Sequence, residues 1–501
     1  RVDENGLVNY AEVVSETEEV TNGDFATDSD WTKGTGVTIS GGKANWTNTA
    51  NNVGVTQSGI LTSGKNYKVV FTVSNYSSGS VRLRFPAITE RVMANGTYTY
   101  YINATATNLY IQGETNGDAN VNFSIDNVSV KEILRDNVPR IDYTGGGCPH
   151  ILAEPQRTNE VTYSEDFSSW SNDNSTDTPN SITAPDGTLT ATKVTEDTAT
   201  GRHGIWTNIG SQTGTEFSFS AYVKDNDRRY VSIVLSDTAS WNSMVVFDLT
   251  TGTITKEYTK SGYTGTSSIT AIGNGWYRIS NTLTGLAFSG STVYSRIYLQ
   301  DTPTPANPPN NTYTGDGISS IYIWGAQLEA GSYPTSYIPT SGGTVTRNQD
   351  IFTRDGIGSL INSTEGVLFA EIAALADDNT NRCISLSDGT ETNRVSIVLG
   401  TSNNHIRGMV LSGGTSFDFS TFSYNTLNNN KIAIKYKVND FALWINGVEV
   451  GTDTSGNTPV GLNRLVFDLG GGTLNFFGKV KQLQVFKTAL TESELIALTT
   501  I

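Results

Sequence analysis

The sequence predicts an all-β protein of three antiparallel sandwich domains in tandem, followed by one short helix near the C-terminus. Short runs in which apolar and polar residues alternate recur along the chain, for example at residues 67–73, 217–223 and 431–436. This alternation is typical of half-buried antiparallel strands. Turn signals such as Ala94-Asn-Gly96 and Gly273-Asn-Gly275 separate the runs at the spacing of a β-sandwich. A length of 501 residues predicts about three domains.

Two stretches without alternation mark the expected boundaries. Residues 131–160 and 331–356 combine charges, prolines and glycines, as ordered connectors do. We therefore expect an N-terminal connector (1–14), a first sandwich (15–134), a connector (135–160), a second sandwich (161–340), a linker (341–356) and a third sandwich (357–501). The helix is predicted by Thr491-Glu-Ser-Glu494, because this capping box satisfies backbone N–H groups at a helix start.

The first two blocks read as a divergent repeat. Each opens with an acidic residue followed by Phe and then a Trp, at Asp24-Phe25 with Trp31 and at Asp166-Phe167 with Trp170. Each closes with an alternating strand, at residues 123–130 and 318–328. A fold whose first and last strands pair would explain both ends, which favours the jelly-roll sandwich.

Composition excludes several classes of function. With 33 Lys+Arg against 49 Asp+Glu the net charge is −16, and each of the three blocks is itself acidic. We therefore expect no nucleic-acid partner, because phosphate binding needs clustered cations. The three His and two Cys lie far apart without metal-ligand spacing, so neither a zinc site nor a redox pair is expected. No apolar run is long enough for membrane insertion.

Motifs in each block resemble known families. The first block, with Asn22-Gly-Asp-Phe25, Trp31 and the closing strand 123–130, resembles jelly-roll carbohydrate-binding modules. The second is similar to a module common in virion proteins of tailed bacteriophages, through residues 139–147, 154–159, 163–167, 275–278, 324–329 and 333–339. In that family this module usually follows an opening like residues 1–7 directly, so the first sandwich is expected to be an insertion. The third block resembles laminin-G/concanavalin-like lectin sandwiches, through residues 437–447, 478–486 and 489–498.

Candidate binding residues follow from the chemistry of sugars. A sugar ring has apolar faces and a polar rim, so a site needs exposed aromatic rings for stacking and polar side chains for the hydroxyls. The candidates are Trp46, Tyr76, Arg82 and Arg84 in the first block and Trp206, Arg229 and Trp241 in the second. Arg82 and Arg84 share one face of a strand, where they could bind an acidic or hydroxyl-rich ligand, protect a sheet edge or pair with carboxylates. Trp276, Trp324 and Trp444 are expected in cores.

The resemblance to jelly-roll modules also implies a structural calcium ion that ties the first turn to the last strand. The matching positions are Asp24 and Asp126 in the first block and Asp166 in the second. Calcium prefers carboxylate and carbonyl oxygens, and no EF-hand loop is present. No other cofactor is expected.

Together, the resemblances imply a phage virion protein, as a tail, fibre or surface-decoration component. It would display lectin-like modules, at the virion surface or outside the cell, to glycans of the host or the environment. Other virion proteins would be its partners, and a homo-oligomer, a trimer or hexamer, is expected. The alternatives are a spacer without ligand and the non-catalytic part of a secreted polysaccharide-degrading enzyme. No catalytic motif stands out, so no enzymatic activity is expected.

Overall fold

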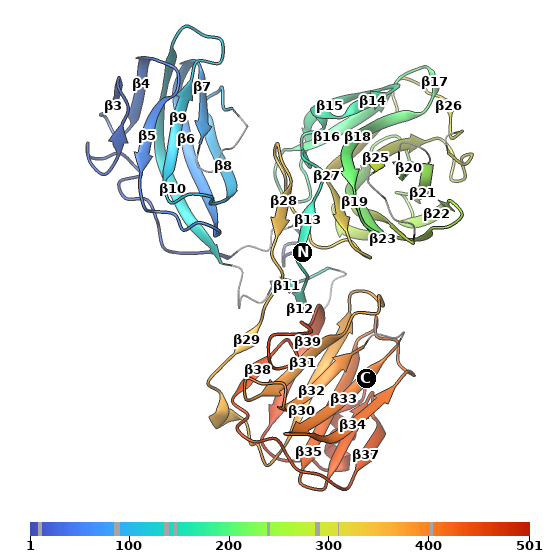
Figure 1. Ribbon diagram of the computed structural model, residues 1–501. Helices are drawn as coiled ribbons and strands as arrows, with labels where there is room; N and C mark the ends of the chain where they lie inside the picture. Colours follow the sequence, from blue (N-terminus) through green and yellow to red (C-terminus); the bar gives the residue numbers. More distant parts are fainter. Residues whose placement is uncertain are drawn as a thin grey trace. The chain divides into compact units, whose positions relative to one another are not determined.

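The computed structural model describes residues 1–8, 13–84, 91–134, 140–144, 148–237, 241–285, 291–308, 310–400 and 404–501. The chain divides into two compact units, one of residues 12–135 and one of residues 1–11 with 136–501. The N-terminal residues therefore belong to the same unit as the chain that follows residue 135. Figure 1 shows the strands of both units.

The unit of residues 12–135 is a sandwich of two antiparallel sheets around one core. The first sheet has the order β3 (Val37–Ile39), β4 (Ala44–Thr49), β10 (Val121–Leu134), β6 (Asn66–Ser78) and β8 (Gly96–Asn103), and β1 (Val13–Val14) pairs with β10. The second has the order β2 (Thr32–Lys33), β5 (Val53–Gln57), β9 (Leu109–Glu114) and β7 (Ser80–Leu83). Alternation sets the inward face, because Tyr67, Val69, Phe71 and Val73 of β6 are all buried in the core.

In the larger unit, the second sandwich consists of two six-stranded sheets. One has the order β14 (Ser171–Asp173), β18 (His203–Gln212), β25 (Ser291–Gln300), β20 (Tyr230–Asp237), β21 (Trp241–Asp248) and β22 (Thr253–Thr259). The other has the order β15 (Ser175–Ile182), β16 (Ala191–Glu196), β27 (Ser320–Ala330), β19 (Glu216–Asp225), β24 (Trp276–Thr284) and β23 (Thr264–Gly273). A short pair, β17 (Thr200–Gly201) with β26 (Tyr313–Thr314), and the 3-10 turn η1 (Phe167–Ser169) complete it.

The third sandwich includes strands from the connector. Its seven-stranded sheet has the order β11 (Arg140–Asp142), β12 (His150–Ala153), β39 (Gly478–Phe486), β30 (Glu365–Ala374), β35 (Asn430–Lys437), β36 (Phe441–Ile445) and β37 (Val448–Asp453). The facing sheet has the order β29 (Thr353–Arg354), β38 (Arg464–Val466), β31 (Arg382–Ser387), β32 (Asn393–Leu399), β33 (Ile406–Ser412) and β34 (Thr415–Thr421), and η2 (Gly358–Leu360) follows β29 along the chain. β13 (Arg157–Asn159), which precedes the second sandwich along the chain, pairs with β28 (Val345–Arg347), which follows it.

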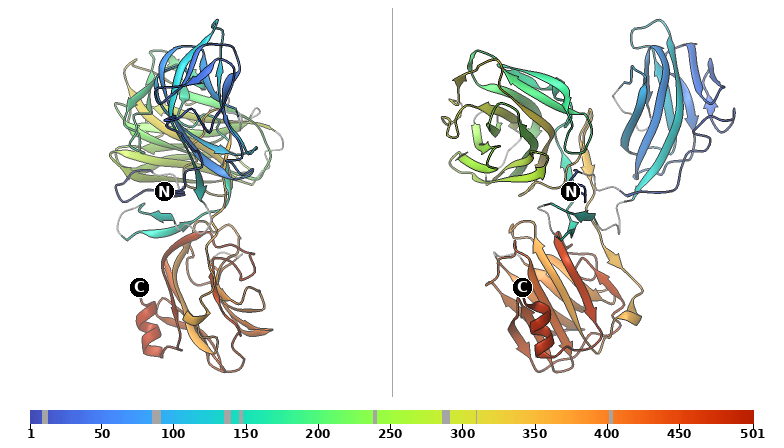
Figure 2. Two further views of the ribbon diagram at one scale, coloured as in Figure 1. Left: turned by 90° about the vertical axis from the view of Figure 1, so that its left-hand side faces the viewer. Right: turned by 180° about the vertical axis from the view of Figure 1, so that it is seen from behind.

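The all-β expectation is confirmed, with α1 (Glu492–Thr499) as the one α-helix in the part of the chain that the structure describes. The capping box at Thr491 and Glu494 is present as predicted. Leu495 packs against Trp444 and Phe369, so α1 covers the face of the seven-stranded sheet that points away from the core, as Figure 2 shows. Among the described residues, no helix has the length and apolar character that a membrane span requires.

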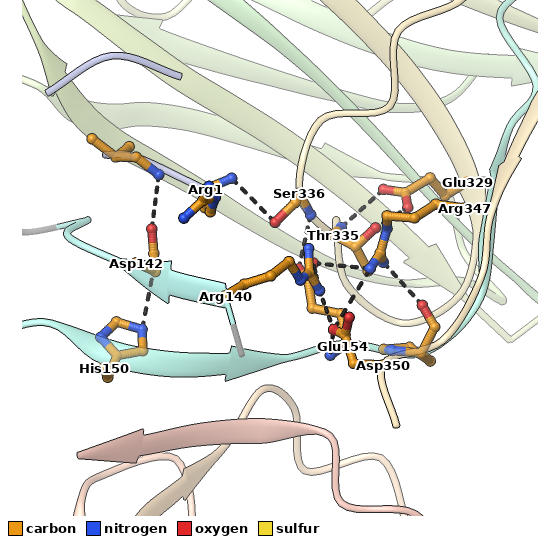
Figure 3. Close-up of polar contacts among 12 residues, drawn as sticks. Arg1, Arg140, Asp142, His150, Glu154, Glu329, Thr335, Ser336, Arg347 and Asp350 are labelled. Atoms are coloured by element: carbon orange, nitrogen blue, oxygen red, sulfur yellow. Dashed lines mark hydrogen bonds and ion pairs between the residues drawn. The ribbon is translucent and has the colours of Figure 1, made fainter. Parts of the chain in front are cut away.

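The connector is fixed by a buried network of two arginines and two acids (Figure 3). Arg140 Nη2 lies 2.8 Å from Glu154 Oε2 and also forms an ion pair with Asp350. Arg347 Nη1 lies 3.3 Å from the same Glu154 oxygen, and the Glu154 backbone N–H donates to Asp350 at 2.6 Å. The four side chains are 3–8% exposed. This charge-balanced group joins the connector strands to the segment that precedes the third sandwich.

Neutralising one acid of this network should destabilise the larger unit. Burial acts to raise the pKa of Glu154, but Arg347 and Arg140 outweigh it and bring the pKa from 4.5 down to about 2. We expect Glu154→Gln to cost about 3–5 kcal/mol at pH 7, because an excess buried cation remains. Guanidinium-chloride unfolding measures the loss.

The same substitution predicts a pH dependence. The folded-state pKa of Glu154 is depressed, so its contribution is full above pH 4.5 and is lost as the pH falls towards 2. The stability difference between wild type and Glu154→Gln should narrow over that window. Asp418→Asn, which breaks an exposed pair with Arg407, is the control and should cost less than about 1 kcal/mol. Equal losses in the two variants would contradict the prediction.

Candidate functional site

A cluster of aromatic and basic side chains lies on the six-stranded sheet that contains β14 and β18. In β18 and β25, Ile205 and Ile297 pair with each other and point into the core. The neighbouring pair, Trp206 and Arg296, therefore points to the opposite, outward face. We call the following residues the Trp–Arg platform: Asp173, Arg202, Trp206, Trp241, Tyr294, Arg296 and Tyr298.

Arg296 is the centre of the platform. Its guanidinium carbon lies 4.6 Å from the ring centroid of Trp241, 5.0 Å from that of Tyr294 and 5.3 Å from that of Trp206. Its Nε donates a hydrogen bond to Ser236 Oγ at 3.2 Å. The quadrupole of each ring attracts the cation, so these contacts fix the guanidinium among the rings.

Asp173 and Arg202 form the polar side of the platform. Asp173 accepts hydrogen bonds from Trp206 Nε1 at 3.2 Å and from the Tyr298 hydroxyl at 2.8 Å. Arg202 lies over the Trp241 ring at 4.8 Å, and its Nε is 3.7 Å from Asp173 Oδ2. Burial raises the pKa of Tyr298, with Asp173 adding to the rise, so the phenol remains a protonated donor.

A glycine makes the close approach of the two strands possible. Gly204 pairs with Tyr298 across β18 and β25. A Cβ at Gly204 would lie 2.1 Å from the Ile297 carbonyl oxygen and 2.8 Å from Tyr298 Cα, distances that no side chain could occupy. The absence of a side chain at this position allows Tyr298 to lie beside Asp173.

The platform combines the chemical groups that a saccharide needs. Trp206, Trp241, Tyr294 and Arg296 are half-buried, so their rings and N–H groups are held in place and partly accessible. Aromatic faces can stack on the apolar face of a sugar, while guanidinium N–H groups donate to its oxygens. Two of the residues predicted from the sequence, Trp206 and Trp241, come together here.

The third candidate of this domain, Arg229, is engaged elsewhere. Its Nε and Nη2 donate to the two oxygens of Asp248 at 2.8 and 2.6 Å, and its guanidinium lies 5.2 Å from the Tyr230 ring centroid. It is not among the residues that contact Arg296. Arg229 therefore lies outside the platform.

In the first sandwich, the prediction for Trp46 is wrong. Trp46 is 2% exposed, its Nε1 donates to the Val53 carbonyl at 2.8 Å, and its ring centroid lies 4.7 Å from that of Phe123. The sequence suggested that the ring of Trp46 is available for stacking, but Ala44 and Trp46 alternate inward on β4. Trp276, Trp324 and Trp444 are buried as predicted.

The other candidates of the first sandwich bond to their own sheet. Tyr76 is half-buried and its hydroxyl donates to the Gly79 carbonyl at 2.8 Å. Arg82 Nη1 lies 2.9 Å from Glu114 Oε1, and Arg84 Nη1 donates to Gln112 Oε1 at 3.1 Å. Of the alternatives open for Arg82, the structure contains the pairing with a carboxylate, and it also places Arg82 on β7, an edge strand of its sheet. These side chains do not form a stacking surface with Trp46.

The residues expected to hold calcium have local hydrogen bonds. The Val128 N–H donates to the Gly23 carbonyl at 2.8 Å, so the opening turn does meet the closing strand. Asp24, Asp126 and Asp166 each accept from a backbone N–H one or two residues later. In the described ranges, no group of three or more His, Cys, Asp and Glu could hold a metal ion. A calcium ion held by two carboxylates and backbone carbonyls stays a prediction.

A cavity of about 790 Å³ is also present in the larger unit. Hydroxyl groups of β23 and β24, connector residues and residues 374–379 line it. Some of its polar groups bond to one another, as Ser268 does to Ser280 at 2.6 Å and Arg278 to the Thr335 carbonyl at 2.6 Å. Among the described residues, no Trp lines the cavity, so it is a weaker candidate for sugar stacking than the platform.

Comparisons with known proteins bear on the fold alone. No protein-family model matches the chain, and no curated protein matches it. Similar solved structures include the CBM40 of a Ruminococcus gnavus IT-sialidase bound to α2,3-sialyllactose, at 14% identity over 30% of this chain and 98% of that chain, with a TM-score of 0.25. The CBM22-1–CBM22-2 tandem of Paenibacillus barcinonensis Xyn10C is 11% identical over 65% of this chain and 100% of its own, with a TM-score of 0.23.

A third similar structure is that of domains LG4-5 of the mouse laminin α1 chain. It is 11% identical over 58% of this chain and 89% of that chain, with a TM-score of 0.19. Carbohydrate-binding modules and laminin G domains are thus among the structures to which the sandwiches are similar. At these identities and TM-scores, the likenesses carry no information on ligand or activity.

The difference in burial between the tryptophans predicts different effects on stability. Trp46→Ala should destabilise the unit of residues 12–135 by about 3–5 kcal/mol, because it empties a core position. Trp206→Ala, at a half-buried position, should cost on the order of 1 kcal/mol. Urea unfolding of the two variants measures both values, and a Trp46→Ala protein as stable as wild type would contradict the core assignment.

Proposed function

We propose that the protein binds carbohydrate through the Trp–Arg platform. The observation that carries this proposal is the placement of two half-buried indoles and a guanidinium on one outward sheet face. Trp206 and Trp241 flank Arg296, so a sugar lying on one ring has N–H donors at its rim. Stacking and hydrogen bonding from one rigid surface are the two requirements of saccharide recognition.

The sheet holds this surface in a fixed arrangement. Beside Arg296 on the same outward face, Val234, Met244 and Val246 form a small buried cluster with Tyr298 of the platform. Side chains fixed by such packing lose little conformational entropy when a ligand binds. A single platform of this size suits weak binding, and several copies in one particle would raise the total affinity.

We further propose that the chain is a virion component of a tailed phage, in its tail, fibre or surface decoration. The support is the similarity of residues 139–167 and 324–339 to a module of phage virion proteins. In this role the protein lies at the virion surface or outside the cell, contacts other virion proteins and assembles as a trimer or hexamer. It binds glycans of the host surface without cleaving them.

Binding to glycans tests the first proposal. Wild-type protein should bind a subset of host-envelope polysaccharides on an array, and Trp206→Ala or Trp241→Ala should weaken this binding about thirty-fold, as expected for a central aromatic contact. Trp276→Phe, a conservative change in a buried core, is the matched control. If the protein binds none of the glycans, the spacer alternative is favoured. Release of reducing sugar from a bound glycan would favour a polysaccharide-degrading enzyme.

Location tests the second proposal. Antibodies raised against the protein should label one position on purified tailed-phage particles from cells that produce the chain, as seen by immunogold electron microscopy. Repeated labels around the particle axis would also report the oligomer. Protein found only free in the medium, and absent from the particles, would contradict a virion role.

A further inference from the structure

We propose that the platform selects acidic saccharides, with Arg296 binding their carboxylate or sulfate group. This inference rests on the proposed function of the same surface and names its ligand class. It follows from three features of Arg296: its charge is not neutralised by an acid, its Nη groups are accessible, and the rings hold it in place.

The first feature is the missing acid. Among the residues that the structure describes, no carboxylate forms an ion pair with Arg296. In the same sandwich, Arg228 pairs with Glu196 and Arg229 with Asp248. The chain carries a net charge of −16, so acids are abundant, yet none of those that the structure describes forms an ion pair with this guanidinium. A half-buried cation that lacks a counter-ion is an attractive site for an anion from outside.

The second feature is the state of the hydrogen-bond donors. Arg296 donates through Nε to Ser236, and in the described part of the chain its two Nη groups have no acceptor. Neither Nη atom of Arg296 is a buried atom without a hydrogen-bond partner, so both are open to solvent. The fork of N–H groups matches the two oxygens of a carboxylate or sulfate, and binding there would be bidentate.

The third feature is the cage of rings. Contacts with Trp206, Trp241 and Tyr294 restrain the guanidinium but accept none of its N–H hydrogens in the plane of the fork. The other charges of the platform do not cancel Arg296. Asp173 already accepts from Trp206 and Tyr298 and lies beside Arg202, which leaves two cations against one anion.

Matched pairs of glycans test the inference. The probes are oligogalacturonate with its carboxyl-reduced counterpart, and dextran sulfate with dextran. Titration followed by tryptophan fluorescence measures the affinity for each, because Trp206 and Trp241 belong to the platform. We expect wild type to bind the acidic member of at least one pair about ten-fold more tightly or better, as a charge-assisted bidentate contact allows.

Two variants assign this preference to Arg296. Arg296→Gln should lose the preference for the acidic member, whereas Arg296→Lys, which keeps the charge without the fork, should keep part of it. The control is Arg407→Gln, which removes the same charge from an exposed pair on β33 of the third sandwich and should leave the preference unchanged. A preference that survives in Arg296→Gln would overturn the assignment.

The outcomes for this inference and for glycan binding itself are distinct. Wild type that binds both members of each pair equally, or binds only neutral glycans on the array, would overturn the selection of acidic saccharides and leave carbohydrate binding in place. Wild type that binds none of the probes and nothing on the array would overturn both. Circular dichroism of each variant separates a loss of binding from a loss of folding.

Discussion

The buried ion network of the connector is the constraint on which the larger unit depends. Arg140 and Asp350 are 210 residues apart in sequence, and the second sandwich lies between them in the chain. Together with Glu154 and Arg347, this pair joins the segment that precedes the second sandwich to the segment that follows it. Removing charges from water is costly, so each of these side chains is stable there only while its partners are present.

The network and the platform surround their arginines with different partners. In the connector, two cations face two anions within a space that is 3–8% exposed, and the charges balance. On the platform, Arg296 is held by rings and a hydroxyl, and in the part of the chain that the structure describes no acid pairs with it. Both arrangements fix a guanidinium, but only the first pairs it with carboxylates. This contrast supports the proposal that Arg296 binds a ligand, whereas the arginines of the network are structural.

Periodicity was enough to predict the fold class, because alternation determines which residues can share a face of a strand. In a strand with few apolar residues, such as β4, it could not determine which of the two faces would meet the core. Residues 295–299 alternate clearly, yet nothing in the sequence alone distinguishes Arg296 on a ligand-binding face from Arg296 on an ordinary solvated one. The prediction that Trp46 is exposed was wrong for this reason, because its polar neighbours on β4 point outward while Trp46 points inward. The connector network could not be predicted from the sequence, because its partners come together only when the domain between them in the chain has folded.

The outward face of the sheet that contains β14 and β22 both packs apolar side chains together and carries the proposed binding residues. Its apolar part, with Val234, Met244 and Val246 fully buried, needs apolar cover against water. Trp241 packs against that part and at the same time contacts Arg296 and Arg202 from its exposed side. An aromatic ring suits both roles, because one part of its surface can be buried while the rest attracts cations and sugar faces. Packing thus provides the rigidity, and we propose that Arg296, for which the described residues supply no ion-pair partner, provides the selectivity.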